Sequence, residues 1–173
     1  MQQVAPDQPY LETDRLYLRP LVQADFDRLC LLDTDSTVRS FFPEGALTLP
    51  QIQTELDRHL LAWQTLGFGI FAVIHKETQL LIGRCGFAQL KNGTVEMGFL
   101  FLCEYWGQGY ATEAAQSVLA WGLEHIPVDR IVGFAPCDHV ASRRVLEKCG
   151  MQFDRLDFYR NIPCVFYYAT RMK

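Results

Sequence analysis

The chain has 173 residues and a net charge of −4; 49% of its residues are hydrophobic and 21% are charged. This composition is ordinary for a soluble globular protein, and the length fits one domain that can bury a full core. The negative charge gives no support for a nucleic-acid-binding surface. No apolar run approaches the ~20 residues of a membrane helix, and the N-terminus MQQVAPDQPY lacks the basic and apolar segments of a signal peptide. We therefore expect a cytoplasmic protein without nucleic-acid or membrane partners. A flexible tail (1–10) precedes a single domain (11–173).

The cysteines and histidines are dispersed along the chain. None of the six cysteines forms a C-x-x-C pair and several lie in apolar runs, which is typical of reduced core residues in a cytosolic protein. The four histidines are scattered as well, so we predict no metal site.

The first half of the chain begins with a strand and two helices. Alternation of apolar and polar residues predicts a strand over 15–21, and Asp25 begins a short helix. A second helix has its N-cap at Thr48, a proline at Pro50 in its first turn and a terminating glycine at Gly67.

The pattern then changes from helical to extended. Residues 68–76, 80–90 and 94–102 are predicted to be three consecutive strands, separated by a polar turn at 77–79 and an Asn-Gly turn at 92–93. The middle of the chain is therefore an antiparallel meander.

The second half alternates helices and strands. A helix is predicted over 110–125, a strand over 129–137, a helix over 139–150 and a final or edge strand over 164–172. The order of elements indicates one α+β domain, with helices on both faces of a mixed sheet. Edge strands near residues 164–172 are able to pair across a homodimer, so we expect a monomer or a homodimer.

One segment, GFLFLCEYWGQGYATEAAQSVLAWGLE (98–124), runs from an apolar strand through two close glycines into a helix. The first turn of a helix has unsatisfied N–H groups and about half a unit of positive charge. Gly107 and Gly109 allow close approach and positive φ angles. The turn therefore predicts a phosphate or pyrophosphate site.

Other interpretations of this turn fit less well. A Walker A loop is rejected because the lysine of G-x-x-x-x-G-K-[ST] is absent. A dinucleotide fingerprint requires glycine where Thr112 stands, and it normally opens a strand–helix–strand unit rather than following a meander. Asp138, after the next strand, keeps this alternative open. A plain tight turn without a ligand also stays open.

Three segments, in this order, are similar to the GNAT N-acetyltransferase superfamily: LETDRLYLRPL (11–21), EYWGQGYATEA (104–114) and ASRRVLEKCGM (141–151). The family's acetyl-CoA motif, Q/R-x-x-G-x-G/A, falls on residues 106–111. Within the superfamily the chain resembles the Rim-type branch, whose members acetylate the N-termini of ribosomal proteins.

The resemblance implies a GNAT-like, mostly antiparallel central sheet and acetyl-CoA as cosubstrate. The strand before the turn would splay from its neighbour and pair with the pantetheine arm through the backbone of Phe99, Leu100 and Phe101; one of its N–H groups would polarise the thioester carbonyl. The pyrophosphate would lie on the backbone N–H groups of the turn. This phosphate turn comprises Trp106, Gly107, Gln108, Gly109, Tyr110, Ala111 and Thr112.

Transfer of acetyl to an amine requires a base, and the resemblance favours Glu96. This residue lies in an otherwise apolar strand, where burial raises a carboxyl pKa toward the working range. The alternative is a solvent-facing or ion-paired carboxylate, because alternation places Val95 and Met97 on the opposite side of the strand. Glu113, in the first turn of its helix, is better explained by the helix dipole.

The last helix is expected to serve the leaving thiolate. Ser142 matches the position of the proton donor in Rim-type enzymes, or is simply a capping hydroxyl. His139 stands where the family has an asparagine that holds the CoA arm; it contacts CoA or merely belongs to the first helical turn. Trp106 replaces the usual Gln or Arg of the motif. Cys103 is not expected to be a nucleophile, because no histidine is placed to activate it.

The sequence contains few signals for the side of the site that binds the amine acceptor. This acceptor side should involve residues 39–48 and 156–168, where Glu44 is able to contact an amine. Aromatic candidates for its wall, each more often a core residue, are Phe41, Phe42, Trp63, Tyr159 and Tyr167. We predict an acetyl-CoA-dependent N-acetyltransferase acting on a peptide N-terminus or on a small amine such as an amino acid, polyamine or aminoglycoside. A non-catalytic CoA-binding regulatory module is the alternative.

Overall fold

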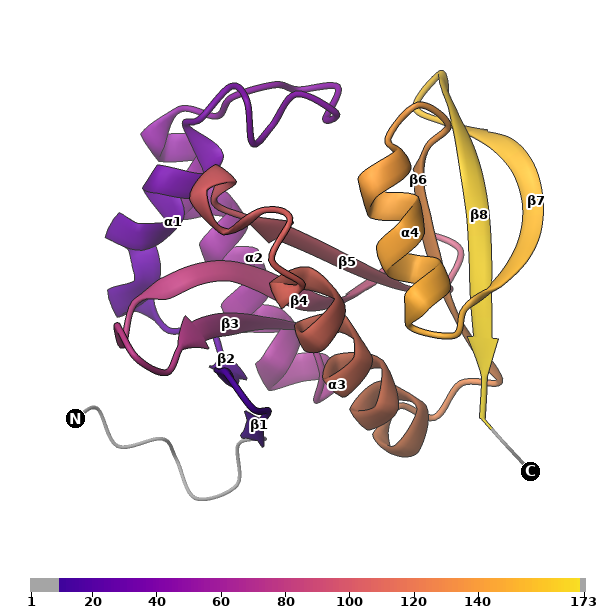
Figure 1. Ribbon diagram of the computed structural model, residues 1–173, viewed down its shortest axis with the longest axis horizontal. Coiled ribbons are helices and arrows are strands. Elements are labelled where there is room, and N and C mark those ends of the chain that lie inside the picture. Colours follow the sequence, from indigo (N-terminus) through magenta and orange to yellow (C-terminus); the bar gives the residue numbers. More distant parts are fainter. Residues whose placement is uncertain (1–9, 172–173) are drawn as a thin grey trace.

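The computed structural model describes residues 10–171, so most of the predicted tail lies outside it. Eight strands within this range form one sheet in the order β1-β2-β3-β4-β5-β6-β8-β7 (Figure 1). They are β1 (Leu11–Glu12), β2 (Leu16–Pro20), β3 (Ile70–His75), β4 (Leu81–Gln89), β5 (Val95–Phe101), β6 (Arg130–Pro136), β7 (Gln152–Tyr159) and β8 (Ile162–Thr170). The helices of the same range are α1 (Phe26–Asp33), α2 (Leu49–Leu66), α3 (Tyr110–His125) and α4 (Val140–Lys148), with short 3-10 turns η1 (Gln23–Asp25) and η2 (Cys103–Tyr105).

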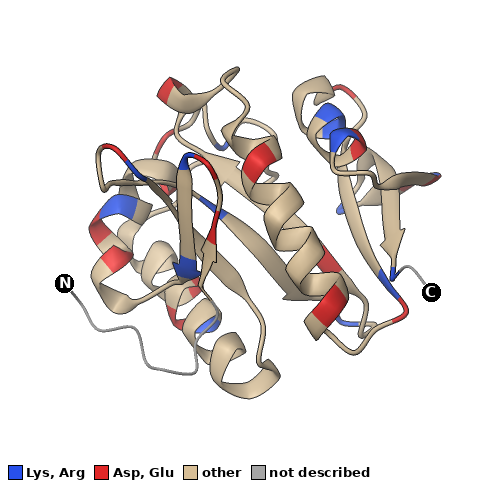
Figure 2. Ribbon diagram, turned by 60° about the horizontal axis from the view of Figure 1, so that its bottom comes forward, with Lys and Arg blue, Asp and Glu red and all other residues tan. Residues whose placement is uncertain are grey.

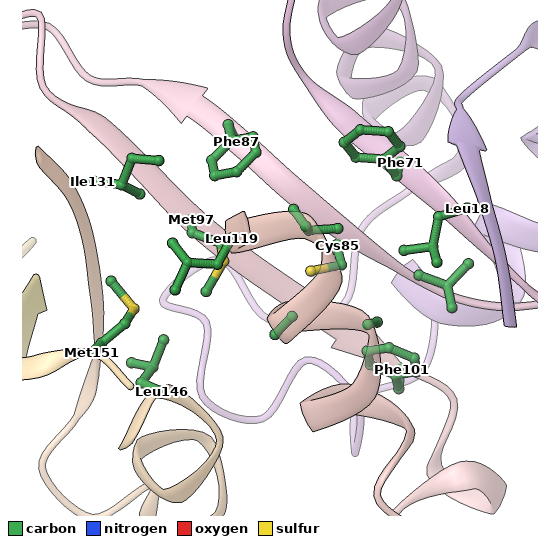
Figure 3. Packing of buried hydrophobic residues seen from close by; sticks show 14 of the residues in the cluster. Leu18, Phe71, Cys85, Phe87, Met97, Phe101, Leu119, Ile131, Leu146 and Met151 are labelled. Carbon is green, nitrogen blue, oxygen red and sulfur yellow. The ribbon is translucent and has the colours of Figure 1, made fainter. Parts of the chain in front are cut away.

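Helices cover both faces of the sheet, which confirms the predicted α+β class. α3 and α4 pack over one face, where side chains from most of the strands meet them in the larger core cluster (Figure 3). α1 and α2 cover the other face through a second cluster. Burial of these apolar surfaces is the main stabilising contribution to the fold. The second cluster includes Leu29, Leu32, Ile52, Leu56 and Leu100.

Local signals placed α2 correctly. The Thr48 hydroxyl accepts a hydrogen bond from the Gln51 N–H, and the Gln51 side chain accepts one from the Thr48 N–H. This reciprocal cap satisfies two N–H groups that the first turn leaves free. Gly67 ends the helix with a φ of 75°, a conformation that favours glycine.

The C-terminal strands differ from the prediction in one respect. β8 is the final strand, as predicted, but it lies between β6 and β7 and is not an edge strand; β7 forms the edge on this side of the sheet. Figure 1 shows β7 at the outer side of the molecule. Phe153, Leu156 and Phe158 of β7 are exposed. Phe153 and Leu156 lie opposite Tyr167 and Val165 of the core cluster, so they share the core face of the sheet but remain exposed at its edge.

One pair of neighbouring strands is parallel. β3, β4 and β5 form the predicted antiparallel meander, but β5 and β6 run in the same direction and are joined by α3. The phosphate turn thus does open a strand–helix–strand unit, and the expectation that it does not was wrong. The strand–helix–strand unit was not recognised from the sequence because its first strand, β5, is also the last strand of the meander.

The ladder between β5 and β6 is short. It holds only two Cα pairs, Val95 with Ile131 and Glu96 with Val132, although β5 continues to Phe101. Beyond Glu96 the two strands diverge, and the structure separates into a half with β1–β5 and a half with β6–β8 and α4 (Figure 1). The predicted splay between the strands is present.

Two glycines opposite each other in the ladder provide a test of the packing. Gly86 on β4 pairs with Gly98 on β5. A Cβ on Gly86 would lie 2.3 Å from the Gly69 carbonyl oxygen and 2.6 Å from the Ile70 Cα, which are backbone atoms that cannot turn aside. We expect Gly86→Ala to lower the free energy of unfolding by about 3 kcal/mol in urea titrations.

Gly98→Ala is the matched control for that substitution. Its Cβ would meet only Glu96 Oε1, at 3.9 Å, which is ordinary contact. We expect a change within about 0.5 kcal/mol. Equal stability of the two variants would contradict the close approach of β3 to β4 at Gly86.

Charged side chains and free thiols are spread over the fold. Acidic and basic residues are interspersed along the ribbon in Figure 2. Within residues 10–171 no helix is both long enough and apolar enough to cross a membrane. All six cysteines are free thiols.

Candidate active site

The backbone of β5 faces the gap at alternate residues. The Leu102 N–H donates to the Ile82 carbonyl of β4 at 3.0 Å. Alternation along an antiparallel strand therefore directs the main-chain groups of Leu100 toward β4, and those of Phe99 and Phe101 toward the gap. The Phe101 carbonyl accepts a hydrogen bond from Trp106 Nε1 at 2.8 Å. Of the three residues proposed to pair with the pantetheine arm, Phe99 is thus the one with both groups open to the gap.

Glu96 lies at the vertex where β5 and β6 separate, since it belongs to their last Cα pair. Its side chain is partly buried, and Oε1 lies 3.9 Å from the position of a Cβ on Gly98, so the carboxylate is directed along β5 toward the gap. Burial raises the pKa of Glu96 to about 7. Among the described residues no ion pair or hydrogen bond to its carboxylate is found, so the alternative of a structural ion pair is not supported.

The phosphate turn has the geometry expected of an anion site. Gly107 and Gly109 have φ angles of 70° and 83°, as predicted. Within residues 10–171 no acceptor is found for the N–H groups of residues 107–112, which lie at the N-terminus of the sixteen-residue helix α3. Such unsatisfied donors fit a phosphate or pyrophosphate group.

Side chains hold this turn in place. Gln108 Nε2 donates to the Glu104 carbonyl at 2.8 Å, and the Tyr110 hydroxyl lies 3.0 Å from Nε2 of the buried His75. Together with the bond from Trp106, these contacts keep the turn in one conformation. A preformed turn binds a ligand with less loss of conformational entropy.

Glu113 ties the first turn of α3 to the N-terminal hairpin. Its Oε1 accepts hydrogen bonds from the Thr13 hydroxyl (2.6 Å) and the Arg15 N–H (2.9 Å), and its Oε2 pairs with Arg15 Nε at 2.7 Å. Burial raises the pKa of Glu113, but these bonds outweigh it and the pKa lies below its ordinary value. Sequence reasoning assigned Glu113 to the helix dipole alone and missed both partners, although they belong to the LETDRLYLRPL segment.

Ser142 and His139 lie at the start of α4. Ser142 is half-buried, one turn before the buried Leu146, and so lies on the inward side of the helix. The His139 ring stacks on Phe41, with centroids 3.7 Å apart. Burial lowers the pKa of His139, and the charge of Asp138 offsets part of that shift.

The Phe41–His139 stack joins the two halves of the molecule, because Phe41 belongs to the loop between α1 and α2. The same acceptor loop (residues 34–48) forms an ion pair from Glu44 to Arg160 in the β7–β8 turn. A cavity of about 170 Å³ lies between this loop and the end of β6. Its lining residues are Ser40, Phe41, Phe42, Pro136, Asp138 and Ile162.

Buried charges fix the start of the acceptor loop. Asp33, at the end of α1, pairs with Arg39 at 3.1 Å and with Arg84 of β4. Arg39 Nε also donates to the Gly45 carbonyl at 2.9 Å. These bonds therefore hold the acceptor loop in a defined conformation.

The aromatic candidates for the acceptor side separate into two groups. Tyr159 packs against Phe134, with ring centroids 4.5 Å apart. Burial raises the pKa of Tyr159, and the charge of Glu96 raises it further. Trp63 instead donates to the Ile70 carbonyl in the core, and the buried Tyr167 bonds to Glu147 of α4. Tyr159 thus belongs to the surroundings of Glu96, whereas Trp63 and Tyr167 are core residues.

Comparison with known structures supports the fold. An acetyltransferase from Agrobacterium tumefaciens str. C58 superimposes with a TM-score of 0.82 at 27% identity, over 98% of each chain. At lower identity, the fold is shared with RimL, a ribosomal L7/L12 alpha-N-protein acetyltransferase in complex with coenzyme A (TM-score 0.79, 14% identity, 94% of this chain and 98% of that one). It is also shared with spermidine N-acetyltransferase from Vibrio cholerae in complex with CoA and spermine (0.77, 16%, 92% and 97%).

Sequence comparison identifies the family. An uncharacterized N-acetyltransferase, YnaD of Bacillus subtilis (strain 168), is 30% identical over 146 residues, which are 83% of this chain and 82% of the relative. The model of the acetyltransferase (GNAT) domain matches residues 15–152, a range that includes the splayed strands, the phosphate turn and α4. The chain therefore belongs to the GNAT family of acetyltransferases.

Proposed function

We propose that this protein is an acetyl-CoA-dependent N-acetyltransferase of the Rim type, which transfers acetyl directly from the thioester to a protein N-terminal amine. The observation that carries the proposal is Glu96, an unpaired carboxylate with a pKa of about 7 at the vertex of the splayed strands. A base with this pKa is half ionised at neutral pH, where it is best suited to accept a proton from an amine.

The phosphate turn and β5 would hold acetyl-CoA, which supplies the thioester. The N–H groups of residues 107–112 fit its pyrophosphate, and the open main-chain groups of Phe99 fit an extended amide such as the pantetheine arm. His139 would support the arm from α4. The assignments of the turn and of β5 follow the family motif, and the positive φ angles, the unbonded N–H groups and the splay of β5 from β6 support them. The assignment of His139 rests on its position in the family pattern alone.

Glu96 accepts a proton from the ammonium form of the acceptor, directly or through water. The amine nitrogen then bonds to the acetyl carbon while the carbon–sulfur bond breaks and its electron pair goes to sulfur. Ser142 donates a hydrogen bond to this sulfur. The thiolate takes up the second proton that the nitrogen loses. Amide and thiol are formed, and one proton is released to solvent in each turnover.

Ser142→Ala is expected to lower kcat roughly 100-fold, because the leaving sulfur loses its donor. The change should fall on kcat rather than on the KM for acetyl-CoA, measured as thiol release. Ser117→Ala, which alters an equally half-buried serine on α3, is the control and should turn over normally. A fully active Ser142→Ala enzyme would remove Ser142 from the mechanism; the alternative of a capping hydroxyl is already excluded, because the N-cap of α4 is His139 and no side chain caps the helix.

A small amine is the second candidate acceptor. The Phe41–His139 stack and the Glu44–Arg160 pair connect the two halves of the molecule on the acceptor side, next to the pocket of about 170 Å³. A cavity of this volume suits a small amine better than a peptide. The three Rim-like segments favour the peptide, and the two neighbours in complex with CoA, RimL and spermidine N-acetyltransferase, represent both classes.

Release of free thiol from acetyl-CoA across an acceptor panel tests the function. The panel contains short peptides beginning with Ser, Ala or Met, beside polyamines, free amino acids and aminoglycosides. Turnover confined to peptides supports the Rim-type assignment, and turnover only on small amines replaces it with the second candidate. Binding of acetyl-CoA without any turnover would contradict the enzyme and favour a regulatory CoA-binding module.

We also propose a single acetyltransferase domain over residues 11–173, located in the cytoplasm. The continuous sheet of residues 11–170 supports one domain, and six free thiols fit a reducing compartment. The exposed apolar residues of β7 are compatible with a homodimer as well as a monomer.

A further inference from the structure

Arg15 contacts the phosphate turn from a distant part of the sequence. It lies between β1 and β2, and its Nη1 donates to the Gln108 carbonyl at 2.9 Å while its Nε binds Glu113 at 2.7 Å. The guanidinium group also lies over the Tyr110 ring, 4.2 Å from its centroid. Three contacts therefore fix the position of this cation beside the turn.

The third nitrogen of the guanidinium lies beside the second glycine of the turn. Nη2 of Arg15 is 3.4 Å from the position of a Cβ on Gly109. Among residues 10–171 no hydrogen-bond acceptor for this nitrogen is found. The Arg15 side chain remains 43% exposed, so a ligand on the turn has access to it.

The turn itself offers no cation. Its first position is Trp106, an exposed aromatic residue whose indole N–H is already bonded to the Phe101 carbonyl. The seven residues 106–112 contain no Lys or Arg, and Glu113 follows them. A pyrophosphate bound here by N–H groups alone would lie close to this carboxylate without a compensating positive charge.

We propose that Arg15 binds the pyrophosphate of acetyl-CoA through Nη2, in addition to holding the turn through Nε and Nη1. This inference depends on the proposed function, because it requires the cosubstrate to lie on the phosphate turn. Arginine suits the role, since its planar fork bonds several acceptors at once and retains its charge. A residue from the N-terminal hairpin thereby supplies the positive charge that the turn lacks.

Calorimetric titration with two ligands separates this role from a purely structural one. CoA contains the pyrophosphate and pantetheine lacks it. Arg15→Gln is expected to raise the Kd of CoA about tenfold, with the Kd of pantetheine unchanged within about twofold. Arg15→Lys, which retains the charge but not the planar fork, should bind CoA more tightly than Arg15→Gln and less tightly than the wild type. Thermal unfolding of each variant establishes that it is folded.

Two further variants control for charge. Lys76→Gln removes a neighbouring cation that pairs with Glu12 instead of the turn, so its affinity for CoA should remain that of the wild type. The double variant Arg15→Gln/Glu113→Gln removes both members of the ion pair and is expected to bind CoA as weakly as Arg15→Gln. Recovery of CoA affinity in the double variant would overturn the proposal, because Arg15 would then serve only to neutralise Glu113.

The remaining outcomes distinguish a failure of the Arg15 contact from a failure of the proposed function. Equal weakening of CoA and pantetheine by Arg15→Gln, or no weakening of either, contradicts the phosphate contact alone. A wild-type protein that does not bind CoA more tightly than pantetheine contradicts the phosphate turn as the cosubstrate site, and with it the proposed function.

Discussion

Replacing Glu96 by Gln is expected to lower kcat by at least about 100-fold, because the amide cannot accept a proton from the acceptor. Gln has nearly the same shape as Glu, so the packing at the vertex of β5 and β6 should persist. The affinity for acetyl-CoA should be unchanged, since the phosphate turn lies beyond the other end of β5. Thiol-release kinetics and calorimetric titration with CoA measure the two quantities separately.

The pH dependence identifies the group. The proposed base must act in its ionised form, and the pKa of Glu96 is about 7. The ratio of wild-type to Glu96→Gln kcat/KM should therefore rise about tenfold per pH unit below pH 7 and level off above it. Taking the ratio cancels the titration of the acceptor amine, which is common to both enzymes.

Glu124→Gln is the control for the Glu96 experiment, because it removes an exposed carboxylate on α3 far along the helix from the phosphate turn. Its ratio to the wild type should be flat across the same pH range. A Glu96→Gln enzyme with full turnover removes Glu96 from the mechanism. A ratio that does not change near pH 7 leaves Glu96 a role in positioning only.

Replacing Gly109 by Asp is expected to raise the Kd of CoA roughly 100-fold. The φ of Gly109 is 83°, which strains any residue with a side chain. The new carboxylate would also lie at the N-cap of α3, where it would accept hydrogen bonds from the N–H groups that fit the pyrophosphate. Strain and competition for the donors therefore act together.

Gly93→Asp separates the two effects. Gly93 has a φ of 84° in the β4–β5 hairpin, and a Cβ there would have no atom within 4 Å. Both substitutions introduce the same charge at nearly the same backbone conformation, so they share the backbone strain. Only Gly109→Asp should lose CoA affinity, and normal binding by this variant would be incompatible with the phosphate turn.

Sequence reasoning succeeded where the signal is local. The bounds of α2 follow from Thr48 and Gly67, and α3 spans residues 110–125 as predicted. Caps and terminating glycines act over a few residues, so the sequence contains the whole cause. The positive φ angles of Gly107 and Gly109 were predictable for the same reason.

It failed where the cause is a contact between distant segments. The interior position of β8 depends on pairing with β6 on one side and β7 on the other, and no residue within 164–172 encodes that neighbour. Arg15 is separated from Gln108 by 93 residues, so its bond to the turn has no periodic signal. The Phe41–His139 stack was hidden in the same way.

Alternation predicted the side of the strand on which Glu96 lies but not its surroundings. Glu96 is on the face opposite Val95 and Met97, which are buried in the larger core cluster. Its desolvation depends on which elements pack over β5, and this is a property of the assembled fold.

The raised pKa of Glu96 also affects the stability of the fold. The pKa changes from an ordinary 4.5 to about 7 on folding. Below pH 4.5 the carboxyl is protonated in both the folded and unfolded states. Between 4.5 and 7 the unfolded chain releases the proton while the folded chain retains it, so the free energy of unfolding falls as pH rises, by up to about 3 kcal/mol. Above pH 7 both states are ionised and the loss is complete. The ionised form that the proposed base requires is therefore not the form in which the fold is most stable.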